Sequence, residues 1–124
     1  MARNEFTFLS ADGKTPIHAV QWLPKGQVQA VLQIAHGVAE YILRYEPFAQ
    51  YLTDQGFAVV GHDHLGHGAS VAPDAPPMYF GPKGSWNWVV DDIDTRRNLA
   101  KKQFPDVPFF CWAIPWVPSL SVPI

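Results

Sequence analysis

The sequence predicts an α/β fold in which a β-hairpin precedes parallel strands that alternate with helices. Three observations predict it: apolar runs of strand length, two stretches with apolar residues at helical spacing, and turn-forming residues between them. With 124 residues the chain is one domain at most. Its composition, 48% hydrophobic and 16% charged, excludes a disordered tail.

Five segments are expected to be strands. Residues 5–9 and 17–23 are joined by the turn sequence SADGK, which predicts an antiparallel hairpin. Residues 30–35 (AVLQIA) are nearly all apolar, as in a strand covered on both faces of a mostly parallel sheet. Residues 57–61 predict a second buried strand, and residues 107–114 (VPFFCWAI) predict one more.

A first helix is expected between the strands at 30–35 and 57–61. Pro47 lies near its first turn, and Phe48, Tyr51 and Leu52 are spaced to form one apolar face. Gly56 follows its end, where a left-handed cap is favoured. Strand, helix and strand in this order predict a βαβ unit with a right-handed crossover.

A second helix is expected after the Pro- and Gly-rich stretch 66–84. Its apolar residues recur at helical spacing, and its acidic and basic residues are expected mainly off that stripe. The apolar stripe is Trp86, Val89, Val90, Ile93, Ala100 and Phe104; the charged residues are Asp91, Asp92, Asp94, Arg96 and Arg97. We interpret Asp91 and Asp92 as acids of the first helical turn and not as an acid/base pair.

Composition and patterning argue against several classes of protein. The net charge of −2 offers no basic surface for nucleic acid. The N-terminal segment has no apolar stretch typical of a secretory signal, so we expect a cytoplasmic protein. Four prolines in the uncharged stretch 107–124 argue against a transmembrane segment there. The single cysteine, Cys111, cannot form an internal disulfide.

Polar residues follow two of the expected parallel strands, at the sheet edge where ligands bind in α/β proteins. His36 and Gly37 follow the strand at 30–35, and a glycine there lets backbone N–H groups approach a substrate. The stretch 61–70 (GHDHLGHGAS) follows the next strand. Two interpretations of this stretch stay open. It could be a metal site, or a sharp loop that its glycines make possible and its polar side chains stabilise.

The two segments together resemble the monoacylglycerol lipase and lysophospholipase branch of the α/β-hydrolases, a group of serine hydrolases. The similar run is HGVAEYILRYEPFAQYLTDQGFAVVGHDHLGHGAS, and the resemblance extends over nearly all of residues 5–110. That branch has HG, a glutamate and an Arg-Tyr pair after its third strand, then a helix, then a strand that ends in D-x-x-G-H-G-x-S. The resemblance therefore implies the N-terminal half of an α/β-hydrolase fold, with an incomplete sheet.

The resemblance also implies roles for individual residues. The backbone N–H of Val38 would be one oxyanion-hole donor for an ester carbonyl. The other motif residues would hold loops and would not be catalysts: His36, Gly37, Glu40, Arg44, Tyr45, Asp63, Gly66, His67, Gly68 and Ser70. The implied substrate is a small lipid ester, and no cofactor or metal is implied; the oligomeric state stays open.

The nucleophile elbow G-x-S-x-G of such a hydrolase, and its later acid and histidine, have no match in the sequence. The genetic code offers an explanation. Trp112 and Trp116 each require the codon TGG. If one base is restored just before Cys111, the reading frame shifts. The last base of each TGG then joins the first two bases of the following codon to give GGC and GGT, which both encode glycine. The restored frame permits F-F-L-L-G-H-S-M-G. We therefore expect residues 1–110 to be the N-terminal part of an α/β-hydrolase domain and 111–124 an out-of-frame tail.

We accordingly expect the chain to be an inactive fragment of a lipid ester hydrolase. Two alternatives from other classes stay open. One is a metal site built on His62, Asp63, His64 and His67. The other is a short, non-catalytic domain that binds a partner through its sheet edge and apolar tail.

Overall fold

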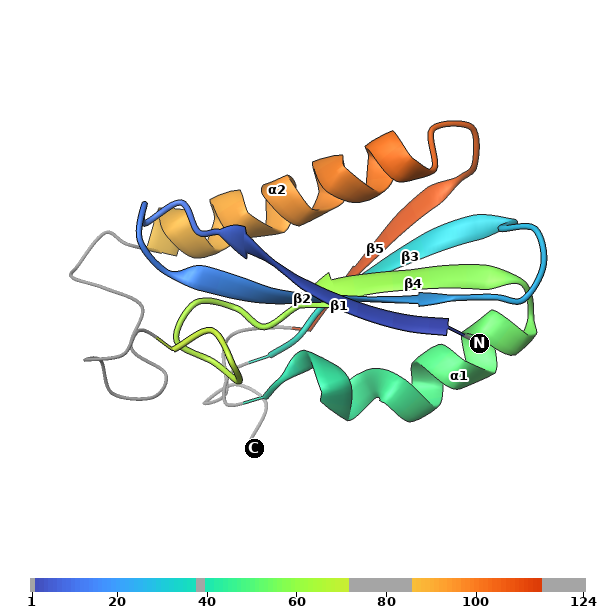
Figure 1. Cartoon of the computed structure of the whole chain (residues 1–124), viewed down its shortest axis with the longest axis horizontal. Coiled ribbons are helices and arrows are strands. Elements are labelled where there is room, and N and C mark those ends of the chain that lie inside the picture. Colours follow the sequence, from blue (N-terminus) through green and yellow to red (C-terminus); the bar gives the residue numbers. More distant parts are fainter. Residues whose placement is uncertain (1, 38–39, 72–85, 115–124) are drawn as a thin grey trace, which may run out of the picture.

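A computed structural model describes residues 2–37, 40–71 and 86–114 and has three layers. A five-stranded sheet forms the middle layer, with α1 (Glu46–Asp54) on one face and α2 (Trp86–Gln103) on the other, as Figure 1 shows. A short 3₁₀ turn, η1 (Ile42–Tyr45), leads into α1. The α/β class expected from the sequence is confirmed.

The strands of the sheet are β1 (Ala2–Leu9), β2 (Pro16–Leu23), β3 (Ala30–Ala35), β4 (Phe57–His62) and β5 (Phe109–Ala113). Their order in the sheet is β1-β2-β4-β3-β5. β1 pairs with β2 and β2 with β4 in antiparallel fashion, whereas β4, β3 and β5 are mutually parallel neighbours. The hairpin and the βαβ unit predicted from the sequence are therefore both present.

The hairpin turn is held by the side chain of Asp12. Its Oδ1 accepts hydrogen bonds from the backbone N–H groups of Lys14 (2.9 Å) and Thr15 (2.8 Å). Gly13 has φ of +79°, a conformation that glycine adopts without a steric penalty. The turn sequence thus closes the hairpin by local hydrogen bonds.

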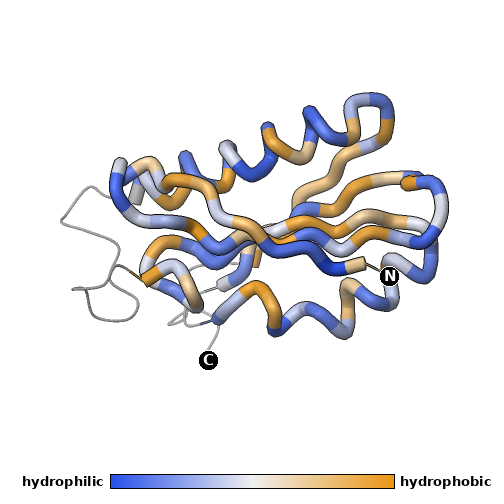
Figure 2. Tube along the Cα trace, viewed as in Figure 1, coloured by the Kyte–Doolittle hydropathy of each residue, from blue (hydrophilic) through white to orange (hydrophobic). Residues whose placement is uncertain are grey.

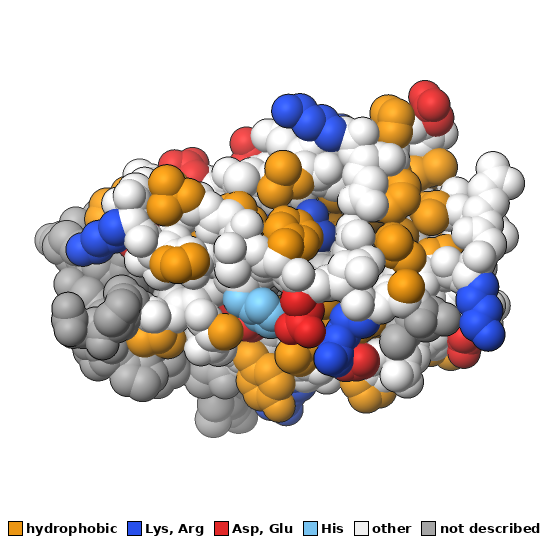
Figure 3. Space-filling model, viewed as in Figure 1, with side chains coloured by type: hydrophobic (Ala, Val, Ile, Leu, Met, Phe, Trp, Pro, Cys, Tyr) orange, Lys and Arg blue, Asp and Glu red, His pale blue; other side chains and the backbone are white. Residues whose placement is uncertain are grey.

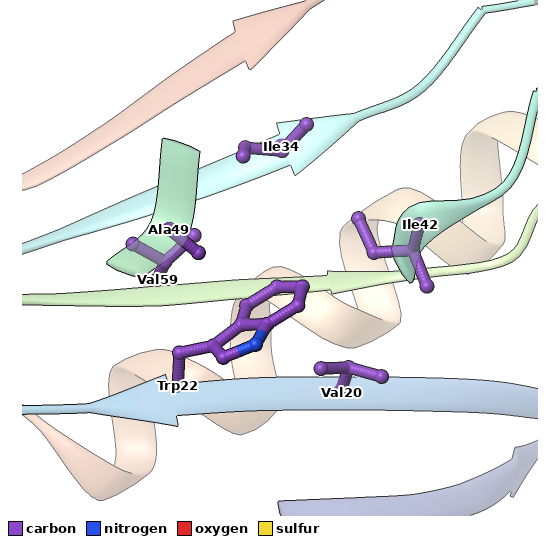
Figure 4. Packing of buried hydrophobic residues seen from close by; sticks show 6 residues of the cluster. All are labelled: Val20, Trp22, Ile34, Ile42, Ala49 and Val59. Carbon is purple, nitrogen blue, oxygen red and sulfur yellow. The ribbon is translucent and has the colours of Figure 1, made fainter. Parts of the chain in front are cut away.

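One hydrophobic cluster lies between the sheet and α1 (Figure 4), and it corrects the predicted face of that helix. Ala49 is fully buried, whereas Phe48 is exposed and Tyr51 is 62% exposed. The small side chain of Ala49 lets the helix backbone approach the sheet, so the larger rings lie at the side. The cluster consists of Val20, Trp22, Ile34, Ile42, Ala49 and Val59.

A second cluster, formed by Val31, Ala58, Val60 and Ala100, lies between the sheet and α2, where the predicted stripe is only partly right. Val89 of α2 is buried in a third cluster, whereas Val90 is exposed. Asp92 and Arg96, which we expected off the stripe, are buried. α2 begins at Trp86 and has no acidic residue in its first turn. Figure 2 shows the alternation of polar and apolar residues along this helix.

Both buried charges on α2 have hydrogen-bond partners, which explains why they are buried. Asp92 accepts bonds from Ser10 Oγ and the Ala11 N–H, each 2.7 Å long. Burial nevertheless raises the pKa of Asp92. Arg96 donates to the carbonyls of Gly61 (3.1 Å) and Val20 (3.0 Å), and burial lowers its pKa to about 10. α2 is therefore tied to the hairpin turn, β4 and β2.

β5 differs from the buried strand that the sequence predicted. It lies at an edge of the sheet, paired with β3 alone, and its residue Phe110 is 59% exposed. The strand continues through Cys111, which is exposed, to Ala113. Among the described residues no helix is long and apolar enough to cross a membrane.

Candidate functional site

The two motif segments meet at the carboxyl ends of β3 and β4. His36 and Gly37 follow β3, and His64 lies in the loop that follows β4. The backbone N–H of His64 donates to Nε2 of His36 over 3.0 Å, and Nε2 of His64 lies 3.0 Å from the carbonyl oxygen of His36. The two loops are therefore joined by a reciprocal pair of hydrogen bonds.

These contacts define the protonation of His36. Its Nε2 accepts a hydrogen bond, so Nδ1 carries the proton and donates to the carbonyl oxygen of Gly37 over 2.8 Å. Burial, together with the nearby His67, lowers the pKa of His36. His36 is therefore a neutral, fully buried residue that fixes the backbone of the turn after β3.

Glu40 closes the same turn from its other side. Its Oε1 accepts hydrogen bonds from the Gly37 N–H (2.6 Å) and the Tyr45 hydroxyl (2.7 Å), and Arg44 Nε lies 3.6 Å from Oε2. Burial opposes the charge of Glu40, but these hydrogen bonds outweigh it and lower its pKa. Burial and the bond to Glu40 raise the pKa of Tyr45 to about 12. Val38, the expected oxyanion-hole donor, lies outside the described residues.

The end of β5 lies directly beside this turn. The Ile114 N–H donates to the carbonyl oxygen of Ala35 over 2.9 Å. A Cβ atom placed on Gly37 would lie 2.9 Å from Cγ2 of Ile114 and 3.0 Å from Oε1 of Glu40. A larger residue at position 37 would require the side chain of Ile114 or Glu40 to shift, so the chain that leaves β5 passes close to the backbone of position 37.

Asp63 is the centre of the second loop. It is buried, and its carboxylate accepts hydrogen bonds from the N–H groups of Ile42 (2.7 Å) and Ala69 (3.1 Å). Its Oδ2 also lies 2.7 Å from Nδ1 of His18 on β2. One side chain therefore joins β2, the η1 turn and the loop after β4.

The backbone of the loop depends on two glycines. Gly66 and Gly68 have φ of +84° and +50°. A Cβ atom on Gly68 would also lie 2.5 Å and 2.6 Å from the carboxylate oxygens of Asp63. Ser70 closes the loop: its carbonyl accepts from the Gly66 N–H, its N–H donates to His67, and its Oγ accepts from the His18 N–H over 2.9 Å.

The metal interpretation finds no support in the described part of the chain. No group of three or more His, Cys, Asp or Glu residues there is placed to hold a metal ion. The carboxylate of Asp63 is occupied by N–H donors, as described above. His62 packs edge-on against the ring of Phe8, with centroids 5.6 Å apart, and burial lowers its pKa to about 3.

His18 is the residue of this region that the sequence reasoning missed. It lies on β2, far from both motifs in the sequence, and its ring reaches Asp63 on one side and Glu5 on the other, 2.7 Å from each. In the sequence, His18 is only a polar residue within a strand of the predicted hairpin. Its partners cannot be identified from that position, because they depend on the register between the strands.

The profile of the serine aminopeptidase S33 family of hydrolases matches residues 26–115, which is more than half of the chain. The chain belongs to this family. The match includes both motif segments and the five-residue strand β5.

Curated members similar to this chain include lipases. Monoglyceride lipase of Rattus norvegicus is 31% identical over 102 residues, which are 82% of this chain and 31% of that protein. Monoacylglycerol lipase of Mycolicibacterium smegmatis is 37% identical over 106 residues, 86% of this chain and 35% of that protein. The chain thus spans about a third of the length of these relatives. Protein K6 of vaccinia virus (strain Western Reserve) is 35% identical over 79 residues, 64% of this chain and 82% of K6.

Solved structures agree with the family. A structure described as a lipase in its open form superposes with a TM-score of 0.85 at 32% identity, over 93% of this chain and 37% of that one. A carboxyl esterase of Bacillus coagulans gives a TM-score of 0.79 at 32% identity, over 90% and 36%. The described residues therefore form part of an α/β-hydrolase fold, as the sequence resemblance implied.

Proposed function

We propose that this chain corresponds to the N-terminal part of a cytoplasmic serine hydrolase that cleaves carboxylic esters of lipids, such as monoacylglycerols or lysophospholipids. The names of the similar lipases support this substrate class. The observation that carries the proposal is the position of the turn after β3. It is fixed by His36 and Glu40, and the end of β5 passes beside it.

In this proposal the turn supplies the oxyanion hole. The backbone N–H of Val38 would donate to the ester carbonyl oxygen as that oxygen gains negative charge during attack. The bonds from Glu40 to Gly37 and Tyr45 would hold the turn in place before substrate binds. Asp63 and the glycine loop would support it from the side of β4. No cofactor is part of the proposal.

The nucleophile would come from the chain that follows β5. In the restored reading frame the serine falls at position 115. It directly follows residue 114, whose backbone N–H donates to the carbonyl oxygen of Ala35 beside the turn. Residues 111–124 would be the out-of-frame tail, and the 124-residue chain would be inactive, because the nucleophile, acid and histidine of the triad have no counterpart in it. Removal of triad members lowers activity by several orders of magnitude.

The test starts with the nucleotide sequence from codon 105 onward. We expect a second frame that encodes the serine elbow and later an aspartate and a histidine. The repaired gene should hydrolyse a monoacylglycerol and label with a fluorophosphonate, and alanine at the elbow serine should abolish both. The 124-residue chain should do neither. The proposal would be refuted if stop codons soon interrupt every reading frame after codon 105, or if the repaired protein hydrolyses no ester.

A second candidate is a non-catalytic domain that binds a partner through the β5 edge, and the exposed apolar residues of that edge favour it. Exposed Phe110 and Trp112 on β5 would supply the apolar contact. Sedimentation and urea unfolding discriminate the two: a monodisperse chain that unfolds cooperatively favours the binding domain, and an aggregating chain favours the broken hydrolase.

A further inference from the structure

The side chain of His18 is placed between two carboxylates. Its Nδ1 lies 2.7 Å from Oδ2 of Asp63, and its Nε2 lies 2.7 Å from Oε1 of Glu5. Carboxylate oxygens only accept hydrogen bonds, and a neutral imidazole has a single N–H. Both contacts are hydrogen bonds at the same time only if both ring nitrogens are protonated. The geometry therefore points to a positively charged His18.

The position of His18 makes this charge important for the loops. Asp63, one of its two acceptors, also holds the N–H groups of Ile42 and Ala69. His18 contacts the same region through its backbone, because its N–H donates to Ser70 Oγ (2.9 Å) and its carbonyl accepts from the Asp63 N–H (2.8 Å). The ring thus fixes the orientation of a carboxylate that joins two loops.

The charged groups around His18 favour its protonated form. Burial opposes the charge, but the hydrogen bonds to Asp63 and Glu5 outweigh it and raise the pKa of His18. Glu5 belongs to β1, and Arg3 Nε lies 3.5 Å from its other oxygen. Figure 3 shows a histidine at the surface next to acidic and basic side chains, and 16% of the His18 side chain is exposed. Solvent therefore reaches the ring, so it exchanges protons with the medium.

We propose that His18 is a positioning residue: in its doubly protonated form it orients the Asp63 carboxylate, and through it the η1 turn and the loop at 63–70. For catalysis this inference rests on the proposed hydrolase function, whereas the structural part does not. It implies that these loops are held most firmly when His18 is charged.

The pH dependence has a definite sign. The pKa of His18 is higher in the folded chain than in the unfolded chain, where it is about 6.5. The stabilisation is therefore complete below about pH 6.5 and is lost as the pH rises through the folded value. At a pH above the pKa of His18 in the folded chain, one ring nitrogen has lost its proton. Its lone pair then faces a carboxylate oxygen, and the two repel each other.

The first experiment uses the unmodified 124-residue chain, or the repaired gene product if that chain aggregates, and follows the histidine ring nitrogens by NMR across pH. We expect His18 to have two protonated ring nitrogens near neutral pH and to titrate above the ordinary histidine value. The protection of the Ile42 and Ala69 backbone amides, measured relative to the intrinsic exchange rate at each pH, should fall once His18 has titrated. A neutral His18 at pH 7, or a titration at or below the ordinary value, would overturn the inference.

Two variants and a matched control separate positioning from general stability. His18→Gln removes the charge, and it should accelerate exchange at the Ile42 and Ala69 amides about tenfold or more, as expected for loss of a charge-assisted hydrogen bond. His18→Arg keeps a charged double donor and should restore much of the protection without the pH dependence. Gln21→Ser removes another cross-hairpin bond, from Gln21 to Asn4 (3.3 Å), and should leave both amides unchanged.

The outcomes distinguish a failure of the inference about His18 from a failure of the proposed hydrolase function. Equal exchange at the Ile42 and Ala69 amides in His18→Gln and Gln21→Ser would refute it. If His18→Gln fails to fold, the titration of the unmodified chain still decides. A repaired gene product without esterase activity, in a chain whose His18 is doubly protonated, would refute only the hydrolase. If that product is active, His18→Gln should lower kcat more at acidic than at alkaline pH.

Discussion

Replacement of Asp63 by alanine tests the central contact of the two loops. The change leaves the buried N–H group of Ile42 and the part-buried N–H group of Ala69 without their acceptor, and it removes the anionic partner of His18. Hydrogen bonds to charged groups contribute about 1.5–3 kcal/mol each, and breaking a buried pair costs about 3–5 kcal/mol. We therefore expect Asp63→Ala to lower the free energy of unfolding by about 3–5 kcal/mol, a large part of the total for a domain.

Urea unfolding followed by tryptophan fluorescence measures this loss, because Trp22 lies in the core beside α1. Asp63→Asn keeps one acceptor oxygen and should lose about half as much. Asp94→Ala removes an exposed carboxylate from α2 and should change stability by less than about 0.5 kcal/mol. If Asp63→Ala unfolds at the same urea concentration as Asp94→Ala, the carboxylate does not hold the loops.

Three further predictions concern the surroundings of the site. Tyr45→Phe removes the hydroxyl that donates to Glu40 and should lower stability by about 1 kcal/mol; an unchanged melting temperature would argue against that bond. Gly61→Ala would place a Cβ 2.9 Å from both the carbonyl oxygen of Ile34 and Cγ1 of Ile42 and should cost about 1–3 kcal/mol in urea unfolding, whereas equal stability would show that both neighbours adjust freely. Because burial lowers the pKa of His62 to about 3, the unfolded chain binds more protons below about pH 6.5. The melting temperature should therefore fall from about pH 6.5 toward pH 4, and His62→Phe should weaken that dependence.

The strands and the loop glycines could be predicted because their signals are local. Alternation of polar and apolar residues predicted the hairpin, and the apolar run AVLQIA predicted the buried β3. Gly56, predicted as a left-handed cap, has φ of +91°. Such features depend on residues close in the sequence, so periodicity and turn chemistry are sufficient to find them.

The errors concern polar residues whose burial depends on distant partners. Asp92 and Arg96 are buried because Ser10 and strand carbonyls satisfy them, which no helical periodicity reveals. Tyr51 is exposed because the small Ala49 is the residue that contacts the sheet. The pairing of His18 with Asp63 requires the register between β2 and β4, which hydrophobic patterning leaves open.

The partners of Asp63 also have a consequence for the order of folding. They lie 6, 21 and 45 residues away in the sequence, so all three meet only after β2, η1 and β4 have come together. Closing such loops is entropically costly before the contacts form. The β1–β2 hairpin and the β3–α1–β4 unit can each assemble without this carboxylate. The bonds of Asp63 should therefore form after the main folding barrier, so that the residue slows unfolding and leaves the folding rate nearly unchanged.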